Sequence, residues 1–142
     1  IVASGGPELK KIKKIAKNCN NIKILGWISD KKLLELLGNC LATIYIPIRE
    51  DFGMSPVESM MAGKPVIGVN EGGIKETIIH QKTGFLLKPD FNINDIMDAV
   101  KKMTPDRALK MRFDCEIHAK LFSKQKFIEN MKKVIKNYKL NK

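Results

Sequence analysis

The sequence predicts an α/β fold in which a Rossmann-like parallel sheet carries helices on both faces. Short β-branched runs alternate with amphipathic helical segments along the chain, which is typical of parallel strands joined by helical crossovers. The runs at 41–46 and 65–69 are apolar almost throughout, as expected of strands that are buried on both faces. A length of 142 residues suits one domain. We therefore predict a single domain over residues 1–142.

The first part of the chain predicts two strand–helix pairs. The segment 1–3 resembles the end of a strand, and Pro7 favours the first turn of a helix that follows it. A second strand ends at Gly26, and Ser29 or Asp30 then caps a leucine-rich helix. The predicted elements are a strand at 1–3, a helix from about 7 to 18, a strand at 22–25 and a helix at 30–39.

The same alternation continues to the C-terminus. The apolar strands at 41–46 and 65–69 flank a loop and a short helix that Gly63 ends. The remaining predicted elements are a helix at 56–62, a short helix from 72 to 79, a strand at 83–87, and helices at 94–103 and about 105–121 and 124–139. In a parallel sheet, ligands bind beyond the carboxyl ends of the strands. The loops 4–8, 47–55 and 70–73 are expected at that edge.

Charge and cysteine content limit the possible settings. Lys and Arg number 26 against 15 for Asp and Glu, a net charge of +11. This excess favours anionic partners such as nucleotides, phosphosugars, nucleic acid or an acidic membrane face, although a general lysine bias explains it equally well. The three cysteines form no C-x-x-C pair and the two histidines lie far apart. We expect buried thiols, a reducing cytoplasmic compartment and no metal site.

The segment 49–66 holds the most informative residues. Glu50 and Glu58 lie eight positions apart on either side of a turn at Gly53. We expect the amides of Met54 and Ser55 to lie at a helix N-terminus, where free N–H groups and the helix dipole favour an anion. An equally good local interpretation is a capping box, with Ser55 as the N-cap and Glu58 at the third helical position.

Seven short motifs follow one another over about residues 1–103. They are Gly6-Pro7, Leu25-Gly26-Trp27-Ile28-Ser29-Asp30, Glu50-Asp51-Phe52-Gly53, Pro56-Val57-Glu58, Ala62-Gly63-Lys64-Pro65-Val66-Ile67, Gly72-Gly73 with Glu76, and Thr83-Gly84-Phe85-Leu86. Their order and spacing resemble those of the "glycosyl transferases group 1" family of retaining, two-domain enzymes. Glu50 and Glu58 resemble the E-x7-E signature of that family.

The resemblance implies that this chain is the C-terminal, donor-binding lobe of such an enzyme, with Glu50 as its catalytic residue near the transferred sugar. It implies that Glu58 binds the ribose hydroxyls, that the Gly53, Met54 and Ser55 backbone holds the diphosphate, and that Ile28 lies beside the base. Phe52 belongs to the same donor-binding set, and further candidate contacts are Gly6, Trp27, Gly72 and Gly73. No metal or cofactor is implied.

The resemblance also suggests a donor and an acceptor. The motifs resemble most closely those of mannosyltransferases that use a GDP-sugar, so GDP-mannose is the favoured donor and a glycan or lipid-linked molecule the acceptor. Such acceptors would fit a basic protein at the inner membrane face.

The family's basic pair for the diphosphate would precede Ile1. We therefore expect a chain cut from a longer one, lacking the first strand and helix of the lobe and its acceptor-binding N-terminal domain, and inactive alone.

Two other functions are considered. A basic nucleic-acid-binding module would use the lysine-rich C-terminal helices, but these have almost no Arg for reading bases. A solvated lysine-rich face is the better interpretation, and we expect no nucleic-acid partner. A nucleotide-sugar epimerase of related fold is the other alternative.

Overall fold

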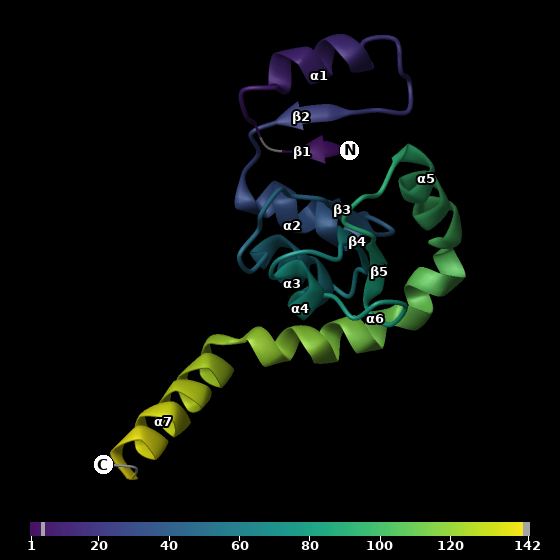
Figure 1. Ribbon diagram of the computed structural model, residues 1–142. Helices are drawn as coiled ribbons and strands as arrows, with labels where there is room; N and C mark the ends of the chain where they lie inside the picture. Colours follow the sequence, from purple (N-terminus) through teal and green to yellow (C-terminus); the bar gives the residue numbers. More distant parts are fainter. Residues whose placement is uncertain (4, 141–142) are drawn as a thin grey trace. The chain divides into compact units, whose positions relative to one another are not determined.

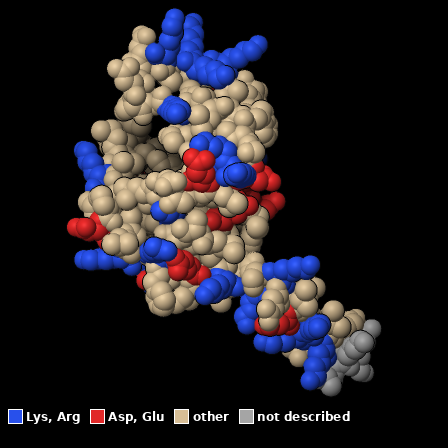
Figure 2. Space-filling model, turned by 180° about the vertical axis from the view of Figure 1, so that it is seen from behind, with Lys and Arg blue, Asp and Glu red and all other residues tan. Residues whose placement is uncertain are grey.

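The computed structural model describes residues 1–3 and 5–140 and divides into two compact units, unit 1 at residues 1–39 and unit 2 at residues 40–142 (Figure 1). Lys and Arg side chains are distributed over both units, including α1 and α7 (Figure 2). Across residues 1–3 and 5–140, no helix is both long enough and apolar enough to cross a membrane.

Unit 1 contains two parallel strands and two helices. β1 (Val2–Ala3) pairs with β2 (Ile24–Gly26), and α1 (Leu9–Ala16) packs on β2. α2 (Asp30–Asn39) begins where the sequence predicts, because the Ser29 hydroxyl accepts a hydrogen bond from the Lys32 amide at 3.3 Å. Pro7, which was expected in the first turn of α1, instead precedes the N-cap residue of that helix.

Unit 2 is built on a three-stranded parallel sheet. Its strands are β3 (Thr43–Tyr45), β4 (Val66–Val69) and β5 (Gly84–Leu87), with β4 in the middle. All four residues of β4 are buried. This confirms that the apolar run at 65–69 is a strand covered on both faces.

The helices of unit 2 begin at residues that suit helix N-termini. Asn92 forms a capping box with Asp95, and the Thr104 hydroxyl caps the next helix, which has Pro105 at its first position. The helices are α3 (Met54–Met61), α4 (Ile74–Thr77), α5 (Ile93–Lys102), α6 (Pro105–Ala119), the 3₁₀ helix η1 (Lys120–Phe122) and α7 (Lys124–Leu140).

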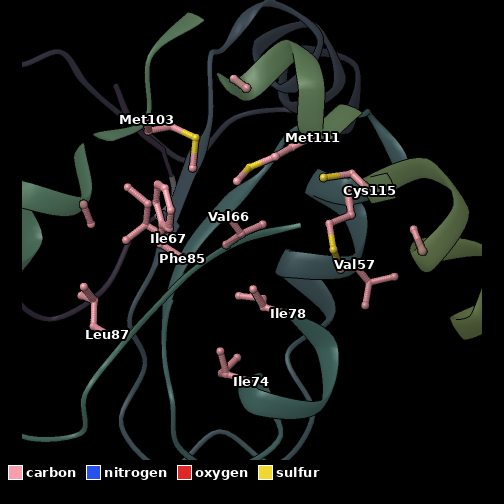
Figure 3. Packing of buried hydrophobic residues seen from close by; sticks show 14 residues of the cluster. Val57, Val66, Ile67, Ile74, Ile78, Phe85, Leu87, Met103, Met111 and Cys115 are labelled. Atoms are coloured by element: carbon pink, nitrogen blue, oxygen red, sulfur yellow. The ribbon is translucent and has the colours of Figure 1, made fainter. Parts of the chain in front are cut away.

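The hydrophobic core of unit 2 has one layer on each face of this sheet, because alternate strand residues point to opposite faces. α5 contacts β5, whereas α3 and α4 contact β4. One layer contains Ile67, Phe85, Leu87 and Met103, and the other contains Val57, Val66, Ile74 and Ile78 (Figure 3). The predicted fold class, a parallel α/β arrangement with helices on both faces, is therefore confirmed.

The expectation of buried thiols was wrong for two of the three cysteines. Only Cys115 is fully buried, whereas Cys19 and Cys40 are partly exposed. Met60, Met103 and Met111 fill the core, but the other methionines of unit 2 are largely exposed. Among the described residues, unit 1 contains the two-stranded sheet β1-β2 and unit 2 the three-stranded sheet β3-β4-β5.

Two adjacent methionines of α3 test this packing. Met60 is fully buried and Met61 is 63% exposed. We predict that Met60→Ala lowers the free energy of unfolding by about 2–5 kcal/mol, because it leaves a cavity in the core. Met61→Ala, the matched control, should change it by less than about 0.5 kcal/mol. Urea unfolding followed by circular dichroism measures both, and equal losses would contradict the assignment of Met60 to the core.

Candidate functional site

The loop between β3 and α3 carries most of the predicted site residues, and it changes the expected start of the helix. Gly53 has a φ of 84°, in the left-handed region, and is the N-cap residue of α3. Met54 and Ser55 are therefore the first two helical residues. The capping box centred on Ser55 was wrong, because the helix begins before Ser55 and no side chain caps it.

The carboxylate of Glu50 is fixed through both of its oxygens. The Tyr45 hydroxyl, at the end of β3, donates a hydrogen bond to Oε2 at 2.7 Å, and the Gly53 amide donates one to Oε1 at 3.1 Å. The Phe52 amide lies 3.4 Å from the same Oε1. Because these donors come from the strand and from the loop itself, the carboxylate has a defined orientation relative to the sheet.

These hydrogen bonds favour the ionised form of Glu50. The bond from the Tyr45 hydroxyl, followed by that from the Phe52 amide, lowers the pKa of the Glu50 carboxyl. The same bond raises the pKa of the Tyr45 hydroxyl, and a hydrogen bond with Ser55 opposes that change. Glu50 is thus an anion at neutral pH, and Tyr45 remains protonated as its donor.

The Gly72-Gly73 pair holds the backbone of the same loop. The Gly73 amide donates a hydrogen bond to the Glu50 carbonyl at 2.9 Å. A Cβ atom on Gly72 would collide with the Glu50 carbonyl, and one on Gly73 would collide with the Asp51 carbonyl and the Phe52 Cα. The loops after β3 and β4 therefore meet, as predicted, and the two glycines contact the candidate site through its backbone.

Gly53 and Phe52 also contact other elements of unit 2, namely α4 and η1. A Cβ on Gly53 would lie 2.5 Å from Cδ1 of Ile74, so a larger residue would have to displace the end of that side chain as well as adopt the left-handed φ. The Phe52 ring lies edge-on to Phe122 of η1, with ring centroids 5.6 Å apart. The Phe52 side chain thus contacts η1, so it has a structural role besides any role in binding.

The predicted anion-binding amides and Glu58 lie on α3. Met54 and Ser55 are exposed, and their amides have no intrahelical acceptor because they lie in the first turn. Glu58 is exposed at the fifth position of α3, two positions further into the helix than expected. On the buried side of α3, the Thr43 hydroxyl of β3 donates a hydrogen bond of 2.9 Å to the Ser59 hydroxyl, which fixes the helix on the sheet.

The remaining predicted contacts belong to unit 1. Ile28 is half-buried after β2, and Trp27 is 81% exposed. The Trp27 indole lies against Gly5, where a Cβ would collide with it, whereas nothing lies within 4 Å of a Cβ on Gly6. Gly5 thus has a packing reason to be glycine, and Gly6 has none within unit 1.

Tyr45 was missed by the sequence analysis. It lies in an apolar β-branched run, and its pairing with Glu50 depends on the path of the intervening loop. The one available signal was a hydroxyl group at the carboxyl end of an otherwise apolar strand, where α/β proteins bind ligands.

The arrangement can bind an anion beside a fixed carboxylate. Helix N-terminal amides suit a phosphate group, and the acceptor oxygens of Glu50 and Glu58 suit hydroxyl groups. Among the described residues, no group of three or more His, Cys, Asp or Glu is placed to hold a metal ion.

The model of the family described as "Glycosyl transferases group 1" matches residues 1–122. The chain is 35% identical over 120 residues to "Alpha-1,3/1,6-mannosyltransferase ALG2" of Dictyostelium discoideum, which covers 82% of this chain and 28% of that protein. It is 35% identical over 127 residues to the protein of the same name in Homo sapiens, covering 87% of this chain and 30% of that protein. The chain therefore spans less than a third of the length of these relatives.

A bacterial relative and several solved structures are also similar. The chain is 30% identical over 119 residues to the "GDP-mannose-dependent alpha-(1-6)-phosphatidylinositol monomannoside mannosyltransferase" of Mycobacterium tuberculosis, covering 75% of this chain and 30% of that protein. Sucrose-phosphate synthase from Thermosynechococcus elongatus matches its fold with a TM-score of 0.79 at 20% identity, over 95% of this chain and 34% of that one. The galactosyltransferase WaaB matches with a TM-score of 0.77 at 16% identity, over 96% and 40%.

The hydrogen bond between Tyr45 and Glu50 can be tested by titration. We predict that Tyr45→Phe raises the pKa of the Glu50 carboxyl, because the largest cause of its lowering is removed. A lowered carboxyl pKa adds stability above the pKa of the unfolded state, and that stability is lost as pH falls through the folded-state value. The variant should therefore lose stability at neutral pH and approach the parent in acid. NMR titration of the Glu50 carboxyl carbon measures the shift, and Tyr138→Phe on α7 should leave it unchanged.

The close contact at Gly73 gives a second prediction. We expect Gly73→Ala to destabilise the protein by about 1–3 kcal/mol, since the added methyl group must displace the Asp51–Phe52 backbone. Gly6→Ala adds the same atom where no neighbour lies within 4 Å and should change stability by less than about 0.5 kcal/mol. Thermal melting compares the two variants. A Gly73→Ala protein as stable as the parent would show that the loops are not in contact.

Proposed function

Since this chain belongs to the glycosyl transferases group 1 family, we propose that it is the C-terminal lobe of a hexosyltransferase and binds the nucleotide-sugar donor. The observation that carries this proposal is the Glu50 carboxylate, oriented by Tyr45 and by the loop amides next to the N-terminus of α3. A fixed anion beside unpaired helix amides suits a ligand that has both hydroxyl groups and phosphates.

We propose GDP-mannose as the donor and a mannosyltransferase as the complete enzyme. Support comes from the similar proteins, which are named as mannosyltransferases in Dictyostelium discoideum and Homo sapiens and as GDP-mannose-dependent in Mycobacterium tuberculosis. The acceptor would then be a glycan or a lipid-linked molecule, bound mainly by parts of the enzyme outside this chain. A cytoplasmic enzyme at the inner membrane face would meet both substrates.

The site residues are assigned to different parts of the donor. The amides of Gly53, Met54 and Ser55 would hold the diphosphate at the start of α3. Glu58, exposed in the second turn, would accept hydrogen bonds from the ribose hydroxyls. Glu50 would contact the transferred hexose.

The proposed reaction retains the configuration at the anomeric carbon. As the bond to the diphosphate breaks, positive charge develops on the sugar ring and negative charge on the departing phosphate. Fixed groups of opposite sign stabilise such charges without reorganising. The ionised Glu50 carboxylate would act on the sugar and the α3 amides on the phosphate, with no metal ion or cofactor required.

Donor binding to the 142-residue chain tests the proposal. We predict that GDP binds without magnesium in the high micromolar to millimolar range, because the basic pair that the family uses for the diphosphate is not among these residues. Calorimetry with GDP, UDP and ADP gives the strength and the base preference. Nanomolar affinity, or an absolute need for a metal, would contradict the assignment.

Charge-neutral variants refine the same test. Glu58→Gln should weaken GDP binding by roughly tenfold or more, the loss expected for a hydrogen bond to a charged group. Glu50→Gln should weaken GDP-mannose binding more than GDP binding, because Glu50 is assigned to the sugar. Glu129→Gln on α7 removes the same charge and should change neither affinity.

A further inference from the structure

The hydroxyl group of Tyr45 connects two parts of the candidate site. It donates a hydrogen bond of 2.7 Å to Oε2 of Glu50, and it also forms a hydrogen bond with the side chain of Ser55 at the start of α3. A tyrosine hydroxyl carries one proton, and here that proton goes to Glu50, because an ionised carboxylate only accepts. The Ser55 hydroxyl therefore donates to the Tyr45 oxygen. These three side chains, here called the Ser55–Tyr45–Glu50 relay, form hydrogen bonds in series with one direction.

The register between β3 and α3 explains how the relay forms. Thr43 and Tyr45 are two residues apart on β3, so their side chains share a face of the sheet and lie about 6–7 Å apart along the strand. Ser55 and Ser59 are four residues apart on α3, so they share a side of the helix and lie about 6 Å apart. Because the two spacings match, Thr43 meets Ser59 and Tyr45 meets Ser55.

The two pairs of hydroxyl groups differ in what they can do. Ser59 is buried, so its bond with Thr43 only fixes the helix on the strand. Ser55 is exposed in the first turn of α3, and its partner Tyr45 continues to the Glu50 carboxylate. Because a carboxylate oxygen can accept two hydrogen bonds, the bond from Tyr45 orients Oε2 without excluding a ligand hydroxyl group.

We propose that Tyr45 is a positioning residue of the donor site, which orients the Glu50 carboxylate toward the transferred hexose and couples it to the start of α3, where the diphosphate is assigned. This inference rests on the proposed function and deepens it. Tyr45 acts through Glu50 and does not itself contact the sugar. Hydrogen bonds in series polarise one another, and a carboxylate held in place stabilises a developing charge without reorganising.

Donor binding separates positioning from general support of the fold. NMR titrations of the 142-residue chain with GDP and with GDP-mannose measure affinities in the weak range expected here. Tyr45→Phe removes only the hydroxyl group. It should weaken GDP-mannose binding about tenfold, the loss expected for a hydrogen bond to a charged group. It should weaken GDP binding much less, because GDP has no hexose for Glu50 to contact.

A double variant tests whether Tyr45 acts through Glu50. In a Glu50→Gln background the oriented carboxylate is already gone, so adding Tyr45→Phe should weaken GDP-mannose binding no further. An undiminished loss in the double variant would show that Tyr45 acts on the sugar by another route, and it would overturn the positioning role.

Thr43→Val is the matched control for the helix. It removes the other hydroxyl donor from β3 to α3 and leaves Glu50 untouched, so it should lower the melting temperature without separating GDP-mannose from GDP. If Tyr45→Phe and Thr43→Val weaken both ligands in the same proportion, Tyr45 only supports the helix and the proposal fails.

Ser55→Ala provides a second variant that leaves β3 unchanged. It keeps the backbone amide of residue 55 but removes the first hydrogen bond of the relay, so it should weaken GDP-mannose binding more than GDP binding. Equal weakening of the two ligands would assign the Ser55 hydroxyl to the diphosphate and contradict the coupling. Circular dichroism checks the folding of each variant.

Failure of this inference is distinguishable from failure of the proposed function. A parent chain that binds neither GDP nor GDP-mannose would contradict the proposed function and, with it, the premise of the relay's role. A parent chain that binds both ligands, with a Tyr45→Phe variant that binds them equally well, would contradict the role of Tyr45 alone.

Discussion

The candidate site depends on a contact between two loops that side chains would prevent. The backbone at 72–73 lies directly on the backbone at 50–52, and the Gly73 amide donates to the Glu50 carbonyl. Because this contact fixes the path of the loop, it also fixes where Gly53 turns into α3 and where Phe52 meets Phe122. The Gly72-Gly73 motif thus has a steric explanation. Because these two residues lack Cβ atoms, the loop after β4 can contact the loop after β3 at the edge where a parallel sheet binds ligands.

Much of the fold could be predicted from local patterns. The strand at 65–69 is apolar because both faces of β4 are covered, and Ser29 and Thr104 are helix caps that act within three residues of themselves. The start of α3 could not be predicted in this way. Ser55, Pro56 and Glu58 satisfy the local rule for a capping box, but Gly53 adopts a left-handed conformation against Ile74 and starts the helix two residues earlier. A contact between distant segments outweighed a local preference.

The same distinction applies to the site. Glu50, Gly53, Gly72 and Gly73 could be selected from the sequence as a group, and the structure brings all four together in unit 2. Tyr45 could not be selected from the sequence. Its hydroxyl group can donate to Glu50 only because the loop after β3 folds back and brings Glu50 to the end of that strand. A tyrosine in a buried strand has many possible partners. Three-dimensional proximity, which sequence spacing does not give, identified this one.

The two glutamates of the site differ in how far the protein fixes them. The Glu50 carboxylate receives hydrogen bonds through both oxygens from groups of the protein itself, and its lowered pKa keeps it ionised. The Glu58 side chain is exposed. The helix that carries it, α3, is fixed to β3 by the hydrogen bond between Thr43 and Ser59. Stabilising a developing charge requires a group that is already in position, since any reorganisation adds to the barrier, whereas a group that only binds can be ordered by its ligand. The contrast in fixation therefore supports assigning Glu50 to the reacting sugar and Glu58 to the nucleotide, independently of the order of the motifs.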